Sequence, residues 1–292
     1  MPTSFAPRVL GTTHLPVGPL GLGSSFGLPA AGVERAFERG VSFFLWGSIR
    51  KRGFGDGLKN LARTHRSDMV IAVQTYTRAG WMMRFGVDRA LRFLKTDYVD
   101  LITLSWWNAP PPPRIVDAAL ELRARGKVRH VMISSHNRPS FSHAIDDAKY
   151  NALMVRYNAA HPGAEREVFP HLARRRPGVV AFTATRWGTL LDPALTPSGE
   201  PTPTASDCYR FALSNPNVDV SLAGPKDDAQ LDEALVTLEK GPMSEDELAW
   251  MRRVGASVRD ATAKRARTSA MGLADRLFAC GSPPPALPPS VA

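Results

Sequence analysis

Cysteine is scarce in this sequence, and long apolar runs are missing from it. The 292 residues include two cysteines, Cys208 and Cys280, which lie far apart and lack the spacing of metal ligands. We therefore expect two free thiols in a reducing compartment. No run approaches the roughly 18 apolar residues of a membrane span. The opening residues also lack the basic and apolar segments of a signal peptide. These absences predict a cytoplasmic protein with no membrane partner.

Aromatic residues are missing from the most basic parts of the chain, although the net charge is +10. The densest basic groups are 174–176 and 264–267, and neither is interleaved with the aromatic residues on which single-stranded bases stack. The other basic residues are scattered, often beside Glu or Asp on helical segments. We therefore expect a solvated, arginine-rich surface and no nucleic-acid partner.

No glycine-rich G-x-G-x-x-G turn follows any strand-like segment, which argues against an open, doubly wound sheet. Strand-like apolar runs instead alternate with helical patterns along the whole chain, as expected for a parallel sheet. Eight such units predict an α/β fold of the (β/α)8 TIM barrel type in a single domain over residues 1–280. The eight expected strands are Pro19–Gly23, Ser42–Trp46, Met69–Thr75, Tyr98–Ser105, Arg129–Ser134, Leu153–Tyr157, Gly178–Thr183 and Val218–Leu222.

Further elements are expected at both ends of the barrel. Residues 8–17 resemble a short hairpin. The segments 244–258 and 263–278 have helical patterns and predict two extra C-terminal helices, the first beginning with a capping box at Ser244 and Glu247. Residues 281–292 are rich in proline and predict a disordered tail.

Several segments, in chain order, resemble the strand motifs of the aldo/keto reductase family. They are Gly40–Gly47, Ile71–Gln74, Asp97–Ser105, Val128–Ser135 and Phe182–Leu190. The resemblance implies a barrel with an N-terminal hairpin and added C-terminal helices. It also implies reduction of carbonyl groups by NADPH, with an Asp, a Tyr, a Lys and a His as the active-site residues.

All four of those active-site positions carry other residues in this chain. Leu45 falls at the Asp position, Arg50 at the Tyr position, Gln74 at the Lys position and Ser105 at the His position. Carbonyl reduction needs an acid that protonates the developing alkoxide, and a Tyr serves when a nearby Lys lowers its pKa. Leu45 cannot pair with a cation, and Arg50 cannot release a proton near neutral pH. We therefore expect almost no ordinary aldehyde or ketone reduction.

The signals for a cofactor are mixed. The resemblance assigns Ser134 to the nicotinamide carboxamide and Phe182 to stacking on the ring. NADP or NAD could be bound by a set comprising Ser134, Ser135, Phe182, Thr183, Gly188 and Lys226. Against this, Gln230 falls where the family has the Arg that holds the 2′-phosphate. No metal site is expected, because Pro162 and Gly163 interrupt the spacing between His161 and Glu165.

The carboxyl ends of the strands form the expected site, because active sites of such barrels lie there. Tyr76 and His136 are the candidate catalytic residues by the alternation of side chains along a strand. The candidate substrate-binding residues are Trp46, Trp107, Arg156, Asn158 and Arg186. Each has a plainer interpretation: the Trp side chains can pack against helices, and Arg156 can pair with Glu165.

Three functions remain open at this point. The first is an oxidoreductase with a non-standard active site, acting on a substrate that needs little acid catalysis, such as an imine or an activated alkene. The second is a non-catalytic barrel that binds a ligand or a partner protein. The third is a non-redox enzyme that uses His136 and Arg156 on an anionic substrate. In each case the cationic mouth predicts a small, anionic ligand.

Overall fold

The computed structural model describes residues 4–47 and 51–268. Arg50, Cys280 and the proline-rich segment 281–292 lie outside the described residues, and the expectations for them stay predictions.

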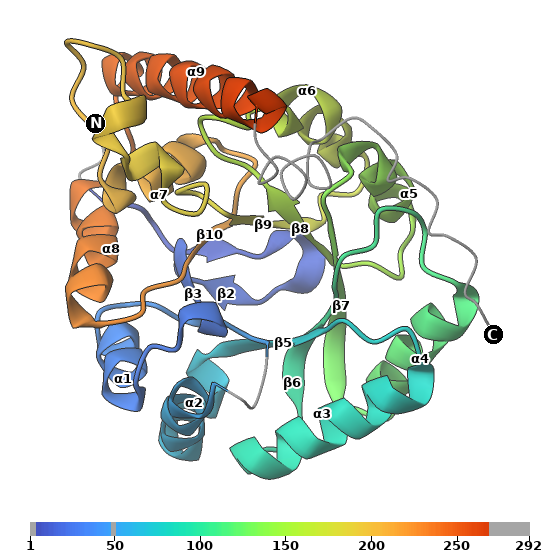
Figure 1. The fold of residues 1–292 in the computed structure, drawn as a ribbon. Helices are drawn as coiled ribbons and strands as arrows, with labels where there is room; N and C mark the ends of the chain where they lie inside the picture. Colours follow the sequence, from blue (N-terminus) through green and yellow to red (C-terminus); the bar gives the residue numbers. More distant parts are fainter. Residues whose placement is uncertain (1–3, 48–50, 269–292) are drawn as a thin grey trace.

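Eight parallel strands close into a barrel in the order β10-β3-β4-β5-β6-β7-β8-β9 (Figure 1). The eight predicted strands are confirmed, and each overlaps the observed one. Their observed bounds are β3 Leu20–Gly23, β4 Phe43–Trp46, β5 Val70–Thr75, β6 Val99–Leu104, β7 Val128–Ser135, β8 Ala152–Arg156, β9 Gly178–Phe182 and β10 Val220–Ala223. The runs are apolar throughout because a parallel barrel strand is buried on both faces.

Helices surround the barrel, as Figure 1 shows in the view along it. Their bounds are α1 Ala30–Glu38, α2 Arg52–His65, α3 Gly80–Leu94, α4 Pro113–Ala124, α5 Phe141–Asp146, α6 Ala164–Glu167, α7 Ala205–Ser214, α8 Asp228–Lys240 and α9 Glu245–Thr268. Across the described ranges, no helix has the length and apolar character needed to cross a membrane.

The predicted break between the two C-terminal helices is wrong, and residues 269–278 of the second lie outside the described residues. One helix, α9, runs through the junction at 259–262, because none of these residues breaks a helix and Thr262 bonds back to the carbonyl of Val258 at 2.6 Å. The predicted capping box is confirmed: the Ser244 amide donates to Glu247 at 2.7 Å, and the Glu247 amide donates to the Ser244 hydroxyl at 3.2 Å.

The N-terminal hairpin closes one end of the barrel. Its strands β1 (Arg8–Val9) and β2 (Pro16–Val17) pair antiparallel, as predicted. Leu10, Leu15 and Val17 join the apolar cluster that fills the barrel. Because the hairpin fills the amino-terminal end, the barrel opens at the carboxyl ends of its strands. We call this open end the barrel mouth.

Side chains alternate between two apolar clusters along each strand. On β4, Phe43 and Leu45 belong to the cluster inside the barrel, whereas Phe44 and Trp46 belong to the cluster between the barrel and its helices. On β8, Met154 lies inside by the same alternation. Each strand end therefore presents alternate residues to the mouth and to the helices.

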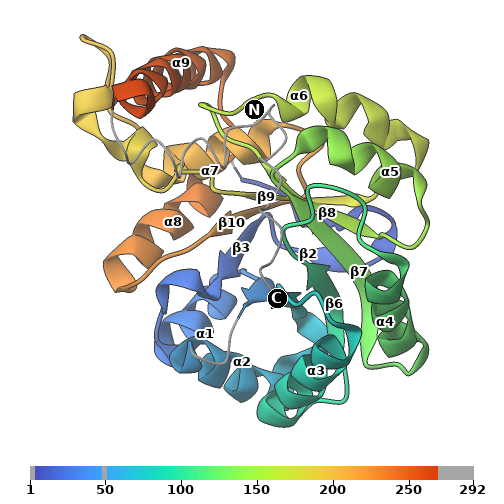
Figure 2. The ribbon, with the colours of Figure 1, turned by 45° about the vertical axis from the view of Figure 1, so that its right-hand side comes forward.

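The long helix α9 lies beside α7 and near α6 in both views (Figure 2). Gly255 makes this approach possible, because a Cβ there would overlap the backbone of Ala159 in the segment after β8. The Ser257 hydroxyl also donates to the carbonyl of Leu195 at 3.1 Å. These contacts hold α9 against the segments that follow β8 and β9.

Candidate functional site at the barrel mouth

The three described positions of the expected acid machinery hold no ionisable group. Leu45 is buried inside the barrel beside Phe43 and is 5% exposed. Gln74 lies at the end of β5, where its amide oxygen would contact a side chain at Gly47. Ser105 follows β6, is fully buried and donates its hydroxyl to the Thr103 carbonyl at 3.4 Å. This part of the mouth can orient a ligand but cannot supply a strong acid.

Trp46 does not contribute to the mouth, which corrects the prediction that it binds substrate. Its side chain is 2% exposed and packs against Phe93 of α3, with ring centroids 5.3 Å apart. It also covers Gly55 of α2. The reason is the alternation on β4: because Leu45 faces the interior, Trp46 must face the helices.

The sequence also predicts Trp107 at the mouth, but its side chain lies elsewhere. Its ring packs against the cluster under the helices, and the guanidinium of Arg78 lies 3.9 Å from the ring centroid. The cause is the backbone of Trp106, whose φ of 63° is left-handed and ends the alternation of β6. As a result Trp106, and not Trp107, reaches the mouth, where it lies against His136.

Arg78 holds the backbone at this part of the mouth through hydrogen bonds. Its guanidinium donates to the carbonyl oxygens of Tyr76 at 3.1 Å, Ser105 at 3.3 Å and Trp106 at 2.9 Å. Arg78 is a residue that no sequence pattern marks. Its position two residues beyond an expected catalytic candidate was the only available signal.

Tyr76 lacks the environment that a catalytic acid needs. It is 57% exposed, and burial of part of the phenol raises its pKa above the ordinary value. A tyrosine that protonates an alkoxide needs the opposite shift, which a neighbouring cation would supply. The structure therefore gives no support to Tyr76 as the acid.

His136 lies in an aromatic setting at the mouth. Its ring makes edge-to-face contacts with Phe182, at 5.5 Å and 87°, and with Trp106, at 5.7 Å and 65°. Burial, with a smaller effect of the Arg156 charge, lowers the pKa of His136 from 6.5 to about 4. The imidazole is therefore neutral near pH 7, where it is a weak acid and a weak base.

The segment after β7 is fixed by Asn108. Its side-chain oxygen accepts from the Ser135 hydroxyl at 3.2 Å and from the amides of His136 at 3.0 Å and Asn137 at 3.2 Å. Ser135 is buried and bonded within the protein, so it is not available to a cofactor. Ser134 differs: its oxygen accepts from the Trp106 amide at 3.0 Å, which leaves its proton for a ligand.

Arg156 is the last residue of β8, at the end of the barrel that forms the mouth. It is 3% exposed, shares the inward parity of Met154 and pairs in register with Phe182 of β9. Near it, both polar atoms of Asn158 are engaged. The amide nitrogen donates to the Thr183 carbonyl at 2.8 Å, and the oxygen accepts from the His161 amide at 2.9 Å. Asn158 thus joins two loops, and the structure does not support it as a substrate contact.

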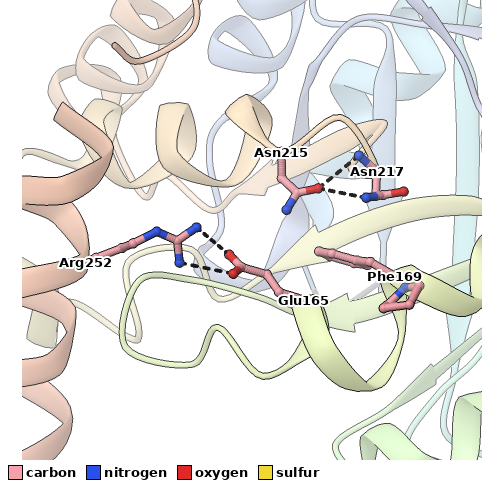
Figure 3. Close-up of a pocket in the computed structure, with 6 residues that line it drawn as sticks. Glu165, Phe169, Asn215, Asn217 and Arg252 are labelled. Atoms are coloured by element: carbon pink, nitrogen blue, oxygen red, sulfur yellow. Dashed lines mark hydrogen bonds and ion pairs between the residues drawn. The ribbon is translucent and has the colours of Figure 1, made fainter. Parts of the chain in front are cut away.

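Glu165, the alternative partner considered for Arg156, belongs to a different network. Its carboxylate receives two bonds from Arg252, at 3.1 and 3.0 Å, and one from the Tyr157 hydroxyl at 2.6 Å. Figure 3 shows Arg252 reaching Glu165 across a surface pocket of about 300 Å³, also lined by Phe169 and Asn215. Tyr157 faces the helices while Arg156 faces the mouth, because they are consecutive in the chain.

The loop after β9 has an unusual backbone. Thr183, Arg186 and Trp187 have φ values of 58°, 50° and 53°, and Gly188 has 87°. Left-handed φ is rare for a β-branched residue such as Thr183, and strained residues of this kind cluster at functional sites. The loop places Arg186 beside Thr189, whose hydroxyl accepts from the guanidinium at 3.3 Å.

The start of α8, near Lys226, is the end of the site where a nucleotide phosphate is expected, and it is less suited to that group. Asp227 caps α8 by accepting from the Gln230 amide at 2.9 Å, and Gln230 in turn accepts from the Lys226 amide at 3.1 Å. Asp228 adds a second carboxylate to the first turn. A helix N-terminus attracts anions, but here a carboxylate of the protein already occupies it. Phe182 and Ser134, the residues expected at the nicotinamide ring, suit a nucleotide better than the start of α8 suits the nucleotide phosphate.

Fold and mouth together define an α/β barrel of the reductase type whose described tetrad positions, Leu45, Gln74 and Ser105, hold no acid. The sequence profile of the aldo/keto reductase family matches residues 30–207, and the chain belongs to that family. Within the described residues, no group of three or more His, Cys, Asp or Glu is arranged to hold a metal ion.

Individual relatives agree with this assignment. The barrel resembles an aldo-keto reductase from Bacillus halodurans in its holo form, with a TM-score of 0.73 and 20% identity over 85% of this chain and 95% of that one. It also resembles an aldo/keto reductase from Klebsiella pneumoniae in complex with NADP and acetate, with a TM-score of 0.72 and 19% identity over 88% and 96%. In sequence, 95 residues are 35% identical to norsolorinic acid reductase B of Aspergillus parasiticus. That match covers 30% of this chain and 25% of the reductase.

Proposed function

We propose that this protein is an oxidoreductase that binds a nicotinamide nucleotide at the barrel mouth and reduces a conjugated carbonyl compound at its carbon–carbon double bond. The observation that carries the proposal is the buried guanidinium of Arg156 in a mouth whose tetrad positions Leu45, Gln74 and Ser105 supply no acid. A cation of this kind stabilises negative charge on oxygen but does not protonate it.

The chemistry of such a substrate suits this site. A bound nicotinamide nucleotide supplies a hydride. Addition of hydride to the β carbon of an enal or enone breaks the π bond and moves its electron pair toward the carbonyl oxygen, which becomes an enolate. Arg156 is placed to hold that oxygen by charge-assisted hydrogen bonds, and water then protonates the α carbon. An imine is the poorer candidate, because its cationic form would be repelled by the same guanidinium.

The residues that would hold the nucleotide are Phe182 and Ser134 at its ring and Lys226 at its phosphate. The Klebsiella pneumoniae relative was solved with NADP and acetate, which supports a nucleotide and a small anion sharing a barrel of this fold. Norsolorinic acid reductase B, the relative in sequence, is named as a reductase, and this supports a redox function.

A non-catalytic, anion-binding barrel is the second candidate. It is favoured by the neutral state of His136 and by the raised pKa of Tyr76, since neither group can take over acid catalysis. The same low pKa disfavours the third hypothesis, a non-redox enzyme, because His136 is a weak base.

Nucleotide binding and hydride transfer together test the proposal. Purified protein is titrated with NADH and with NADPH, and nucleotide fluorescence and melting temperature are recorded. Micromolar binding should raise the melting temperature clearly at millimolar nucleotide. Oxidation of NADH by an enone is then compared for the wild type and Arg156→Met. We expect the variant to keep nucleotide binding and lose at least about tenfold in rate. Absence of nucleotide binding with retained anion binding would favour the second candidate.

A further inference from the structure

Basic side chains converge on one side of the barrel mouth, where the segments after β7, β8 and β9 meet. Asn158 joins the second and third of these by its bonds to His161 and Thr183. The Arg186 amide donates to the same Thr183 carbonyl at 2.8 Å. This backbone arrangement brings His161 and Arg186 to the edge of the mouth that Arg156 occupies.

The neighbouring elements add further arginines. Arg138, after β7, lies against Gly163, where any side chain would overlap its guanidinium, and it pairs with Glu167 of α6 at 2.8 Å. On the outer side, α9 contacts Ala159 through Gly255. One turn further along α9 is Arg259.

The pKa of His161 reflects the electrostatic potential of this region. Burial, followed by the charges of Arg156, Arg186, Arg138 and Arg259, lowers the pKa of His161 to about 3. The potential at the imidazole is therefore positive, although Glu167 neutralises part of the Arg138 charge. The Nδ1 atom of His161 is buried and makes no hydrogen bond to any described residue. A ligand that accepts a hydrogen bond from this nitrogen would satisfy it.

We propose that the mouth holds a dianion, with one negative group at Arg156 and the second in an adjoining subsite formed by Arg186 and His161. The chemical class is a dicarboxylate, or a conjugated carbonyl compound that also carries a carboxylate. This inference rests on the proposed function, since it assigns Arg156 to the same ligand, and it names the substrate class of that site.

Two charges fit this region better than one. The attraction of a ligand to a positive potential grows with the charge of the ligand, and it is stronger in a partly buried site than in water. A planar guanidinium also binds a carboxylate by paired, parallel hydrogen bonds. Two guanidinium groups in one mouth therefore favour a ligand that presents two carboxylates over acetate.

Binding of simple carboxylates tests the inference without any turnover. Acetate, malonate, succinate and glutarate are titrated into the full chain by calorimetry at constant ionic strength. The variants are Arg156→Met, Arg186→Met, His161→Asn and Arg39→Met. Arg39 is the matched control, because it is an exposed arginine of the α1 end that pairs with Glu239. Circular dichroism checks that each variant is folded.

We expect at least one dicarboxylate to bind about tenfold or more tightly than acetate in the wild type. Arg186→Met should remove that advantage while leaving acetate affinity unchanged, and His161→Asn should reduce it. Arg156→Met should weaken both kinds of anion, and Arg39→Met neither. Equal affinities for acetate and every dicarboxylate, or equal losses in Arg186→Met and Arg39→Met, would overturn the dianion subsite. If Arg156→Met leaves acetate binding unchanged, the proposed function fails instead.

Discussion

At the scale of single residues, we expect the barrel mouth to supply fixed positive charge in place of proton chemistry. Leu45 and Ser105 are buried and carry no charge, and Arg156 is buried at the end of β8. A guanidinium keeps its proton at any physiological pH. The site is therefore suited to holding an oxygen that carries negative charge, and unsuited to neutralising it.

Ordinary carbonyl reduction should be nearly absent. General acid catalysis contributes about 10²–10⁴-fold to such reactions, and we find no acid to replace it among the described residues of the mouth. With 4-nitrobenzaldehyde and saturating nucleotide, we expect alcohol formation to be slower by at least this factor than in a family member with the usual acid residues, assayed in parallel. Equal rates in the two proteins would show that another acid serves.

The two partly buried histidines, His136 and His161, should make the protein sensitive to acid. Folding holds the pKa of His136 at about 4 instead of 6.5, so the unfolded chain binds more protons between these values. Stability is therefore complete above pH 6.5 and falls as the pH drops toward 4. Replacing His136 by Asn should reduce the loss between pH 7 and 4.5 by about 1 kcal/mol, since partial exposure screens the charges.

Urea unfolding at the two pH values measures this difference. His171→Asn is the matched control, because His171 is an exposed residue of the segment after α6. If His136→Asn and His171→Asn lose as much stability as the wild type on acidification, His136 does not titrate as described.

Side-chain direction could be predicted for some mouth residues and not for others. The inward direction of Arg156 follows from the alternation along β8, which is regular up to its end. The direction of Trp107 does not follow in this way, because the left-handed φ of Trp106 reverses the alternation after β6. No sequence pattern marks that conformation, since Trp is not a residue that favours it.

At the scale of elements, we expect the start of α8 to influence which nucleotide the protein prefers. Asp227 caps the helix and places a carboxylate where a 2′-phosphate would otherwise be attracted. Asp227→Asn keeps the cap but removes the charge. We expect it to strengthen NADPH binding relative to NADH by roughly two- to fivefold, measured by nucleotide fluorescence. Asp117→Asn, on α4 across the barrel (Figure 1), removes the same charge and should leave the ratio unchanged. A shift of similar size in both variants would contradict this role of Asp227.

Helix α9 shows what sequence patterns can miss at this scale. Its amino-terminal cap was predicted from S-x-x-E, whereas its continuity and its contact with the segment after β8 were not. That contact depends on Gly255, and a glycine inside a helical pattern does not reveal which neighbour approaches it.

Two glycine-to-alanine changes test the packing of α9. Gly255→Ala should destabilise the protein by about 1–3 kcal/mol, because the new methyl group overlaps the Ala159 backbone. Gly86→Ala, in the exposed part of α3 where nothing lies within 4 Å, should stabilise it by about 1 kcal/mol through helix propensity. Denaturant midpoints of the two variants should therefore move in opposite directions. Equal shifts would show that α9 does not depend on this approach.

At the scale of the whole molecule, the barrel is the part that the sequence predicts best. Eight apolar strands alternate with helices, the hairpin Arg8–Val17 fills one end, and the opposite end is left for function. This pattern depends on the composition of the segments and on their order, so it does not require the usual active-site residues. The loops at the mouth follow no such pattern, and their contacts, such as Asn158 with Thr183, appear only in three dimensions.

The most direct test of the account offers the protein a choice within one substrate. Cinnamaldehyde carries both a carbon–carbon double bond and an aldehyde, and NADH deuterated at C4 marks the carbon that receives the hydride. Because we place Arg156 at the enolate oxygen and find no acid for an alkoxide among the described residues of the mouth, we expect the saturated aldehyde, with deuterium at the β carbon. Cinnamyl alcohol as the main product, or no transfer of deuterium to either carbon, would contradict it.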